Sequence, residues 1–292
     1  MDALRELDTW PVRTAAAVVL RSPGTGGAGG AAGAGGPRAV ATQVGVAGDP
    51  AVRFRLASVS KLMSAYAVLV AIEEGALALD EPAGPESSTV AHLLAHASGL
   101  AFSGDRVMAR PGTRRIYSNT GFEELGRHLE RVTDIPFDVY LEEAVFRPLG
   151  MGTAVLEGSP AHAVTATLAD VGAFAAELLA PSLVSAATFA AATSVAFPGL
   201  AGVLPGFGAQ HPNDWGLGFE IRGTKSPHWT GATNSPATFG HFGRSGTFVW
   251  VDPAVNVACV VLTDRDFGDW AGAAWPVLSA DVLAELEVAR TA

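Results

Sequence analysis

The sequence predicts an α+β sandwich: a mainly antiparallel sheet built from both chain ends and flanked by helices, with a mostly helical inserted domain. Two observations favour this class. Short β-prone runs occur near the N-terminus and again after residue 214, whereas residues 80–180 have mainly helical patterns separated by Gly and Pro. In addition, 49% of the 292 residues are hydrophobic, which supplies a large core. We therefore expect a discontinuous sheet domain, residues 1–79 and 205–292, and a helical domain at residues 80–204.

The first elements are a predicted hairpin and a predicted buried helix. Thr14–Leu20 and Ala39–Val46 are β-prone and are separated by the Gly/Ala-rich segment Ser22–Gly36, which we expect to be a long mobile loop. The run Leu62–Ile72 is apolar on nearly every helical face, so we expect this helix in the middle of the protein. Ser58 then falls at the N-cap position of that helix.

The remaining elements follow the same periodicities. Four helices are expected in the middle of the chain, followed by three strands. A last helix should cover the sheet with its apolar face, and its proline, Pro276, is tolerable if it lies in the first turn. The predicted helices are Val90–His96, Phe122–Val132, Phe137–Phe146, Leu168–Leu179 and Ala273–Val288, and the predicted strands are Trp215–Ile221, Thr247–Val251 and Asn256–Thr263.

Composition excludes several classes of function. Charged residues are only 16% and the mean hydropathy is +0.28, but the longest uncharged stretch, Leu178–Asn213, is alanine-rich and interrupted by prolines, unlike a membrane span. A net charge of −10 argues against nucleic acid as a partner. Cys259 lies in an apolar run and is expected to be a buried small side chain. The acidic N-terminal segment does not resemble a secretory signal, so we expect a cytoplasmic protein without a membrane partner.

Lysine is rare in this chain, which makes one lysine motif informative. Only Lys61 and Lys225 are lysines, against 17 arginines. Ser58 and Lys61 form an S-x-x-K motif, and residues three apart share one face of a helix. Serine needs a neighbouring base to act as a nucleophile, and a lysine in an apolar helix loses its charge readily enough to be that base. No motif surrounds Lys225.

Two further short motifs follow in order along the chain. Tyr117 and Asn119 form Y-x-N in a loop, where a phenol can relay protons and an amide can hold a lysine or a substrate amide. His241 and Gly243 form H-x-G shortly before a predicted strand. His92 and His96 have a spacing that suits zinc on a helix, but no H-E-x-x-H motif is present, so we expect no metal and no cofactor.

The ordered series S-x-x-K, Y-x-N and H-x-G resembles the serine penicillin-recognising enzymes: class C β-lactamases, D,D-peptidases and their esterase relatives. Class A enzymes have a sister pattern. The segment His92–Leu100, HLLAHASGL, and Phe146–Met151 are similar to other family segments, and the resemblance extends over Val18 to Val261. It implies the β-lactamase/transpeptidase-like fold.

The resemblance also implies roles for individual residues. Ser58 would form an acyl-enzyme, with Lys61 and Tyr117 sharing the general-base work and Tyr117 protonating the leaving group. Asn119 would bind Lys61 or substrate, and His241 would keep the Tyr117 region electropositive. Gly243 and Arg244 would bind substrate. The backbone N–H groups of Ser58 and Arg244 would form the oxyanion hole.

One position departs from the family pattern. Phe242 stands where lactamases and peptidases commonly have a hydroxyl that contacts the β-lactam carboxylate. We therefore expect a serine hydrolase acting on a small ester or amide, as a carboxylesterase, a D-amidase or a weak β-lactamase. The alternative is a non-hydrolysing penicillin-binding-like sensor or binding protein on the same fold. The sequence does not define the physiological substrate or the oligomeric state.

Overall fold

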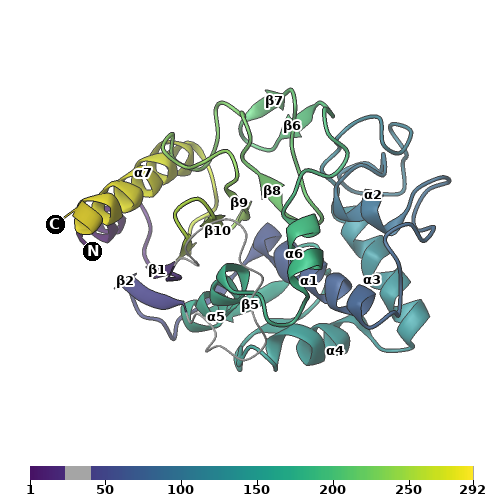
Figure 1. Ribbon diagram of the computed structural model, residues 1–292, viewed down its shortest axis with the longest axis horizontal. Coiled ribbons are helices and arrows are strands. Elements are labelled where there is room, and N and C mark those ends of the chain that lie inside the picture. The colour runs from purple at the N-terminus through teal and green to yellow at the C-terminus, as the bar shows by residue number, and fades with distance from the viewer. Residues whose placement is uncertain (24–40, 292) are drawn as a thin grey trace.

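The structure, a computed structural model, describes residues 1–23 and 41–291. A six-stranded antiparallel sheet forms its centre, in the order β2-β1-β11-β10-β9-β8 (Figure 1). Both ends of the chain contribute strands, which confirms the predicted fold class. The strands are β1 (Ala15–Arg21), β2 (Thr42–Ala47), β8 (Glu220–Ile221), β9 (Phe239–Gly243), β10 (Thr247–Asp252) and β11 (Val257–Thr263).

The two faces of the sheet belong to two different apolar clusters because neighbouring strand residues point to opposite sides. Val18 and Val260 pack on the face covered by helix α1 (Ser60–Glu73), whereas Val19 and Cys259 pack on the face covered by helix α7 (Asp269–Thr291). The interior strands β10 and β11 are therefore buried along their whole length. Cys259 is a buried small side chain, as predicted.

Helices surround α1, which has buried side chains on every side from Ser60 to Ala71. Figure 1 shows α2, α3 and α4 at one end of the molecule and both termini beside α7 at the other. The 3-10 helix η1 (Asp2–Thr9) packs on α7. The other helices are α2 (Val90–Leu94), α3 (Asn119–Thr133), α4 (Phe137–Leu141) with the π-helical turn η3 (Glu142–Phe146), α5 (Leu168–Leu179) and α6 (Ala186–Ala192).

Two small sheets complete the structure. Strands β3 (Arg53–Arg55), β5 (Val164–Thr167) and β4 (Val155–Leu156) form one, and β6 (Gly202–Leu204) with β7 (Gly208–Gln210) forms the other. The β3–β5 pair joins the segment just before α1 to the segment just before α5. It therefore fixes the point at which the chain enters the central helix.

Several boundaries differ from the prediction. The hairpin β1–β2 is present, but its expected mobile loop lies in residues 24–40, outside the described residues. Only the last two residues of Trp215–Ile221 form a strand. Before them, the backbone at Gly216 packs closely against Ala192, and the backbone at Gly218 packs closely against Ala65. Helix α7 begins at Asp269, four residues earlier than expected, so Pro276 lies inside the helix rather than in its first turn.

No described helix is long and apolar enough to cross a membrane. The cytoplasmic location and the division into two domains stay predictions. Helix α5 lies within the segment expected to be the helical domain, yet it packs against β1 and β11 of the central sheet.

Candidate active site

Ser58 lies in a tight turn at the entrance to α1. It is the middle residue of the 3-10 turn η2 (Ala57–Val59), and Val59 is the N-cap of α1. The expected N-cap position of Ser58 is therefore wrong by one residue. Ala57 has a φ of 46°, a left-handed conformation that is strained for a residue with a Cβ. Such strain persists only where surrounding contacts hold the backbone.

The β9–β10 hairpin supplies those contacts. The hydroxyl of Ser245 donates to the carbonyl of Arg55 at 2.6 Å, and the hydroxyl of Thr247 donates to the carbonyl of Leu56 at 2.9 Å. A Cβ on Gly243 would lie 2.3 Å from the same Leu56 oxygen. Glycine thus permits the hairpin to press directly on the backbone before Ser58, which positions the serine.

Lys61 is fully buried next to Ser58, one turn into the α1 region. Its Nζ donates to Asn119 Oδ1 at 2.6 Å and to the carbonyl of Ala161 at 2.8 Å. The amine also lies 4.8 Å from the centre of the Tyr117 ring. Desolvation holds the pKa of Lys61 well below its usual range, although the carboxylate of Glu123 opposes this shift. A neutral amine has two N–H groups, and both are engaged here, so its lone pair is available to accept a proton.

Tyr117 lies between Ser58 and strand β9. The side chain of Ser58 lowers the pKa of Tyr117, though by less than burial raises it, and the Tyr117 hydroxyl lies 3.1 Å from Nε2 of His241. The backbone N–H of Phe242 donates to Nδ1 of His241 at 2.7 Å, so the neutral imidazole carries its proton on Nε2 and donates it to Tyr117. Desolvation raises the pKa of Tyr117 above its usual range.

His241 is neutral in this environment. Desolvation, aided by nearby Lys61, lowers the pKa of His241 to about 3. A pKa this low disfavours the positive charge that the expected role of His241 requires near neutral pH, and that role stays a prediction. Its imidazole instead acts as a hydrogen-bond donor of fixed orientation toward the phenol.

His96 forms part of the same buried cluster but was not predicted as a site residue. Its Nδ1 accepts from the backbone N–H of Ser118 at 3.2 Å, and its ring lies 4.6 Å from the rings of both Tyr117 and Trp215. Among the described residues, Nε2 of His96 has no hydrogen-bond partner. Desolvation lowers the pKa of His96 well below its usual range. The HLLAHASGL resemblance marked this segment, but no spacing rule connected it to Tyr117.

Arg115 holds the Tyr117 loop from behind and was also not predicted. Its guanidinium donates to the carbonyls of Ala95, Ala196 at 2.7 Å and Asn213 at 3.1 Å. The side chain is almost completely buried. Arginine is suited to this task because its planar group donates in several fixed directions at once.

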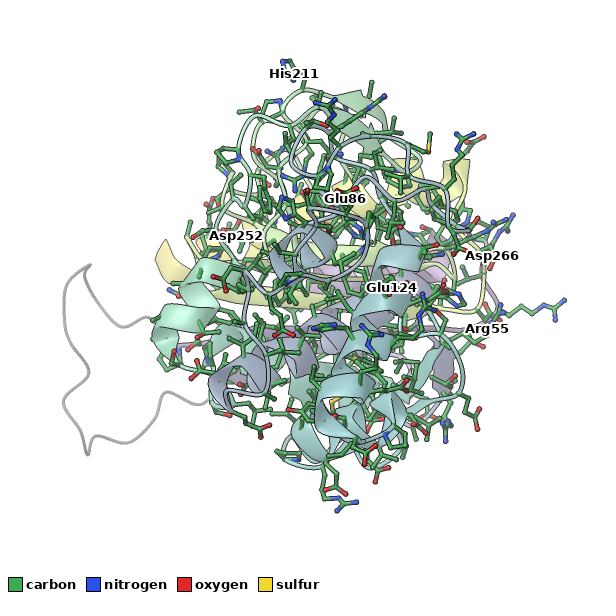
Figure 2. All side chains as sticks on the ribbon, turned by 90° about the vertical axis from the view of Figure 1, so that its right-hand side faces the viewer. Arg55, Glu86, Glu124, His211, Asp252 and Asp266 are labelled. Carbon is green, nitrogen blue, oxygen red and sulfur yellow. The ribbon has the colours of Figure 1, made fainter. Side chains whose placement is uncertain are left out.

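Two cavities meet at Ser58. One, of about 390 Å³, is mostly apolar, and the other, of about 420 Å³, has a mixed lining with more polar groups and extends to the Arg55–Asp266 pair, whose charged atoms are 4.0 Å apart. Figure 2 shows this pair at one edge of the molecule. The apolar cavity is lined by Phe102, Pro205, Phe242 and Phe267 beside the Tyr117 and His241 rings, and the more polar one by Asn119, His162, Arg244 and Ser245.

Lys225 has a structural environment of its own. It forms a buried ion pair with Glu220 on β8, and Glu220 also accepts from His228 at 3.0 Å and from Trp229 at 3.0 Å. These contacts fix the strand beside β9, which carries His241. The pKa of Glu220 is held well below its usual range by Lys225 and His228, which outweigh desolvation.

The comparisons with known proteins agree with this geometry. A family model described as Beta-lactamase matches residues 22–284. The chain belongs to the beta-lactamase family. A crystal structure of a beta-lactamase from Mycobacterium bovis is 54% identical, with a TM-score of 0.89 over 97% of this chain and 98% of that chain.

More distant relatives within the beta-lactamase family carry other names. A protein from Escherichia coli, provisionally named D-alanyl-D-alanine carboxypeptidase, is 25% identical over 53% of this chain and 46% of its own length. The chain thus spans about half the length of the curated relatives it matches. A D-stereospecific amidohydrolase from Streptomyces shares the fold, with 18% identity, a TM-score of 0.68, and coverage of 97% of both chains.

All predicted site residues lie in or beside the two cavities. Ser58 and Tyr117 line the same cavity, Tyr117 is bonded to His241, and Lys61 is bonded to Asn119. Gly243 presses on the backbone before Ser58, and Arg244 lines both cavities. Within the described residues, the backbone N–H groups of Ser58 and Arg244 have no hydrogen-bond acceptor. The roles assigned to these residues stay predictions.

Proposed function

We propose that this protein is a serine hydrolase that forms an acyl-enzyme at Ser58 on a small ester or amide. The observation that carries the proposal is the buried Lys61 amine, with both N–H groups engaged by Asn119 and Ala161. Burial holds the pKa of Lys61 well below its usual range, which favours the unprotonated amine that serine needs as a base to become a nucleophile. Binding alone does not require such an arrangement.

Acylation would begin when the Lys61 amine takes the Ser58 hydroxyl proton as Oγ bonds to the substrate carbonyl carbon. The carbonyl oxygen becomes an oxyanion, and the unpaired backbone N–H groups of Ser58 and Arg244 are suited to stabilise it. These groups are part of a rigid hairpin and turn, so they need no reorganisation when the charge develops.

The leaving group would depart with a proton from Tyr117. The raised pKa of Tyr117 keeps it a phenol, which favours a role as donor over one as base. The proton that Lys61 took from Ser58 would then pass to the Tyr117 phenolate oxygen and restore the phenol; the Lys61 amine lies beside the Tyr117 ring. A water molecule would attack the acyl carbon, give its proton to the same base, and release the acid while Ser58 recovers its hydroxyl proton.

The two cavities suggest where each part of the substrate lies. Phe102, Phe242 and Phe267 line the mostly apolar cavity, which supports an apolar group on one side of the scissile bond. The more polar cavity next to Asn119 and Ser245 suits the other side. Phe242 offers no hydroxyl to a carboxylate, so we propose that neutral esters and amides are turned over faster than β-lactams.

The test is covalent labelling combined with turnover. The protein is incubated with a fluorophosphonate, a cephalosporin and p-nitrophenyl esters of increasing chain length, and adducts are located by mass spectrometry. We expect labelling at Ser58 and steady hydrolysis that falls at least about 1,000-fold in Ser58→Ala. Ser60→Ala is the matched control, because Ser60 is buried and bonded to the Val164 N–H at 3.0 Å.

Two results would contradict the proposal. Equal hydrolysis by the wild type and Ser58→Ala would exclude Ser58 as the nucleophile. Labelling of Ser58 without steady product release from any ester or amide would instead favour the non-hydrolysing sensor, in which the acyl group remains bound.

A further inference from the structure

The segment Ser159–Ala161 lies directly behind the candidate base. The carbonyl of Ala161 accepts from Lys61 Nζ at 2.8 Å, and the carbonyl of Pro160 accepts from the Ser64 hydroxyl at 2.7 Å. Lys61 and Ser64 are three residues apart on one face of α1. The position of this segment therefore decides where one of the two Lys61 acceptors lies.

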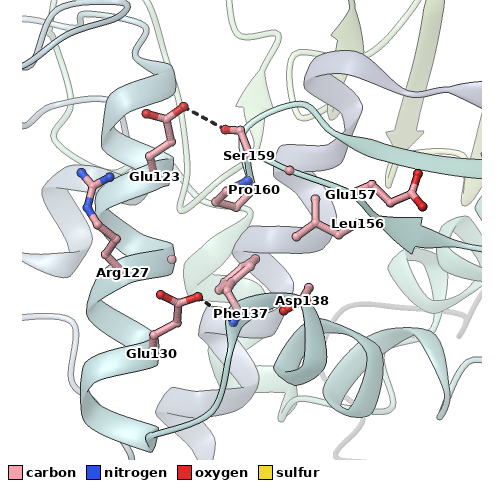
Figure 3. Close-up of a pocket in the computed structure, with 11 residues that line it drawn as sticks. Glu123, Arg127, Glu130, Phe137, Asp138, Leu156, Glu157, Ser159 and Pro160 are labelled. Atoms are coloured by element: carbon pink, nitrogen blue, oxygen red, sulfur yellow. Dashed lines mark hydrogen bonds between the residues drawn. The ribbon is translucent and has the colours of Figure 1, made fainter.

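Glu123 on α3 holds that segment in place. The Ser159 hydroxyl donates to Glu123 Oε1 at 2.9 Å (Figure 3). The same hydroxyl accepts from the backbone N–H of Ala161 at 3.2 Å. Glu123 lies four residues after Asn119, so the two side chains share a face of α3. Both acceptors of the Lys61 amine are thus held from this one helix.

We propose that Glu123 is a positioning residue for Lys61, acting through the Ser159 hydroxyl and the Ala161 carbonyl. The inference rests on the proposed function, in which Lys61 is the general base. Glu123 does not touch substrate in this arrangement. Its side chain instead lines a separate cavity of about 530 Å³, together with Arg127, Ser159 and Pro160 (Figure 3).

The charge of Glu123 adds an electrostatic effect to this hydrogen-bonded support. The titratable groups that face the Lys61 amine are Tyr117, His96, His241 and Glu123. Glu123 contributes the negative charge, which raises the pKa of Lys61 against the stronger effect of desolvation. Removal of that charge lowers the pKa of Lys61 further, so the base stays neutral to lower pH.

The scarcity of lysine permits a direct measurement. Because Lys61 and Lys225 are the two lysines of the chain, selective ¹³Cε-lysine labelling gives two NMR signals, and Lys61→Arg identifies which is which. We expect Glu123→Gln to move the Lys61 titration midpoint to lower pH and to leave the Lys225 signal unchanged. Glutamine retains an oxygen that can accept from Ser159, so this variant removes the charge alone.

Glu130→Gln is the matched control. Glu130 lies on the same helix and lines the same cavity, but its carboxylate accepts from the backbone N–H of Phe137 at 2.9 Å and has no contact with the Ser159–Ala161 segment (Figure 3). We expect this variant to leave the Lys61 midpoint where it is in the wild type. An equal shift in both variants would mean that general charge reduction, not Glu123, controls Lys61, and would overturn the proposal.

Ser159→Ala tests the hydrogen-bonded support separately. We expect kcat to fall by about tenfold with KM nearly unchanged, because the base moves while the substrate cavities do not. The double variant Glu123→Ala/Ser159→Ala should lose no more than the worse single variant, since both act through one contact. Additive losses, or a kcat of Ser159→Ala within about twofold of the wild type, would contradict the proposal.

The two proposals fail in different ways. If the protein turns over no ester or amide while Glu123→Gln still shifts the Lys61 midpoint, the proposed function fails and the coupling of Glu123 to Lys61 stands. If turnover is normal, the Lys61 midpoint is the same in Glu123→Gln and the wild type, and kcat of Ser159→Ala is within about twofold of the wild type, the positioning role fails and the proposed function stands.

Discussion

At the residue scale, the backbone selects one tautomer of His241. The Phe242 N–H donates to Nδ1, so Nε2 carries the proton that reaches the Tyr117 oxygen. A lysine at this position would bring a charge, whereas the buried imidazole brings only a directed hydrogen bond. The family resemblance identified the position but not the protonation state, which depends on desolvation and on the neighbouring Lys61 amine.

This tautomer leads to a prediction about pH dependence. Because the pKa of His241 is lowered to about 3, its titration should produce no limb in the kcat/KM profile between about pH 5 and pH 8. We expect His241→Ala to lower kcat/KM by about 10- to 100-fold, through loss of the donor to Tyr117, without changing the shape of the profile in that range. Kinetics with a p-nitrophenyl ester measure both effects.

The control for this experiment is His211→Ala, which changes an exposed histidine at the surface of the molecule (Figure 2). It should leave kcat/KM unchanged. A limb near the ordinary histidine pKa that disappears in His241→Ala would show that the imidazole titrates during catalysis, contrary to the expectation.

Single residues also show which parts of the candidate site the sequence indicates and which it does not. The sequence singled out Ser58 and Lys61 because S-x-x-K is rare in a chain with two lysines, and it singled out Tyr117 and Asn119 because Y-x-N is rare in a chain with three tyrosines. Glu123 was not predictable, since its contact with Ser159 depends on how α3 packs beside a loop 36 residues later in the chain. Lys225 was unexplained because its partner Glu220 is five residues away across a turn rather than on a shared helix face.

At the element scale, the β9–β10 hairpin and the turn η2 form one rigid unit. Ala57 adopts its left-handed conformation because the hairpin bonds to the carbonyls on its N-terminal side. Strand β9 was not predicted, since its sequence, FGHFG, contains two glycines that lower strand propensity. Those glycines serve close contacts: Gly243 packs on Leu56, and Gly240 packs on the backbone of β10.

Gly243→Ala should therefore damage both stability and activity. An added Cβ would meet the Leu56 carbonyl oxygen at 2.3 Å, so either the hairpin or the turn before Ser58 has to move. We expect a loss of about 1–3 kcal/mol in the free energy of unfolding and at least about a tenfold loss in kcat. Urea unfolding and ester hydrolysis are the two measurements.

Gly272→Ala provides the comparison. Gly272 is in helix α7, and no atom lies within 4 Å of an added Cβ. Alanine should stabilise the protein by about 0.5–1 kcal/mol there and leave kcat unchanged. If Gly243→Ala behaved like Gly272→Ala, the hairpin would not be what holds the nucleophile turn.

At the scale of the whole molecule, the low charge content has a structural explanation. Both faces of the central sheet are covered, by α1 and α5 on one side and by α7 and η1 on the other, so the strands need apolar residues on both faces. The sequence predicted this core from its composition and the bounds of α5 from its helical pattern, and in the structure a capping box of Thr167 and Asp170 fixes where α5 begins. The lengths of β8 and α7 depended on tertiary contacts that periodicity does not encode.

The buried histidines of the candidate site should make the free energy of unfolding depend on pH. His96 and His241 are buried without charge, and desolvation lowers the pKa of both below the ordinary histidine value. In the unfolded chain these side chains bind protons below about pH 6.5, whereas the folded protein binds none until much lower pH. The unfolded state therefore holds more protons in this range, and the free energy of unfolding falls as the pH falls.

The effect should be visible between about pH 7 and about pH 5. We expect His241 alone to contribute a decrease of about 2 kcal/mol over this interval, from about 1.4 kcal/mol per pH unit below its unfolded pKa. Glu220 affects the free energy of unfolding only at lower pH. Its folded pKa is held below its usual range, so its stabilising contribution is lost only when the pH falls below about 4.5.

Urea unfolding at both pH values should show a smaller decrease in the free energy of unfolding for His241→Gln than for the wild type, with His211→Ala behaving like the wild type. Equal decreases in His241→Gln and the wild type would mean that the imidazole is not buried in its neutral form, and the hydrogen-bond direction assigned to Tyr117 would be wrong as well.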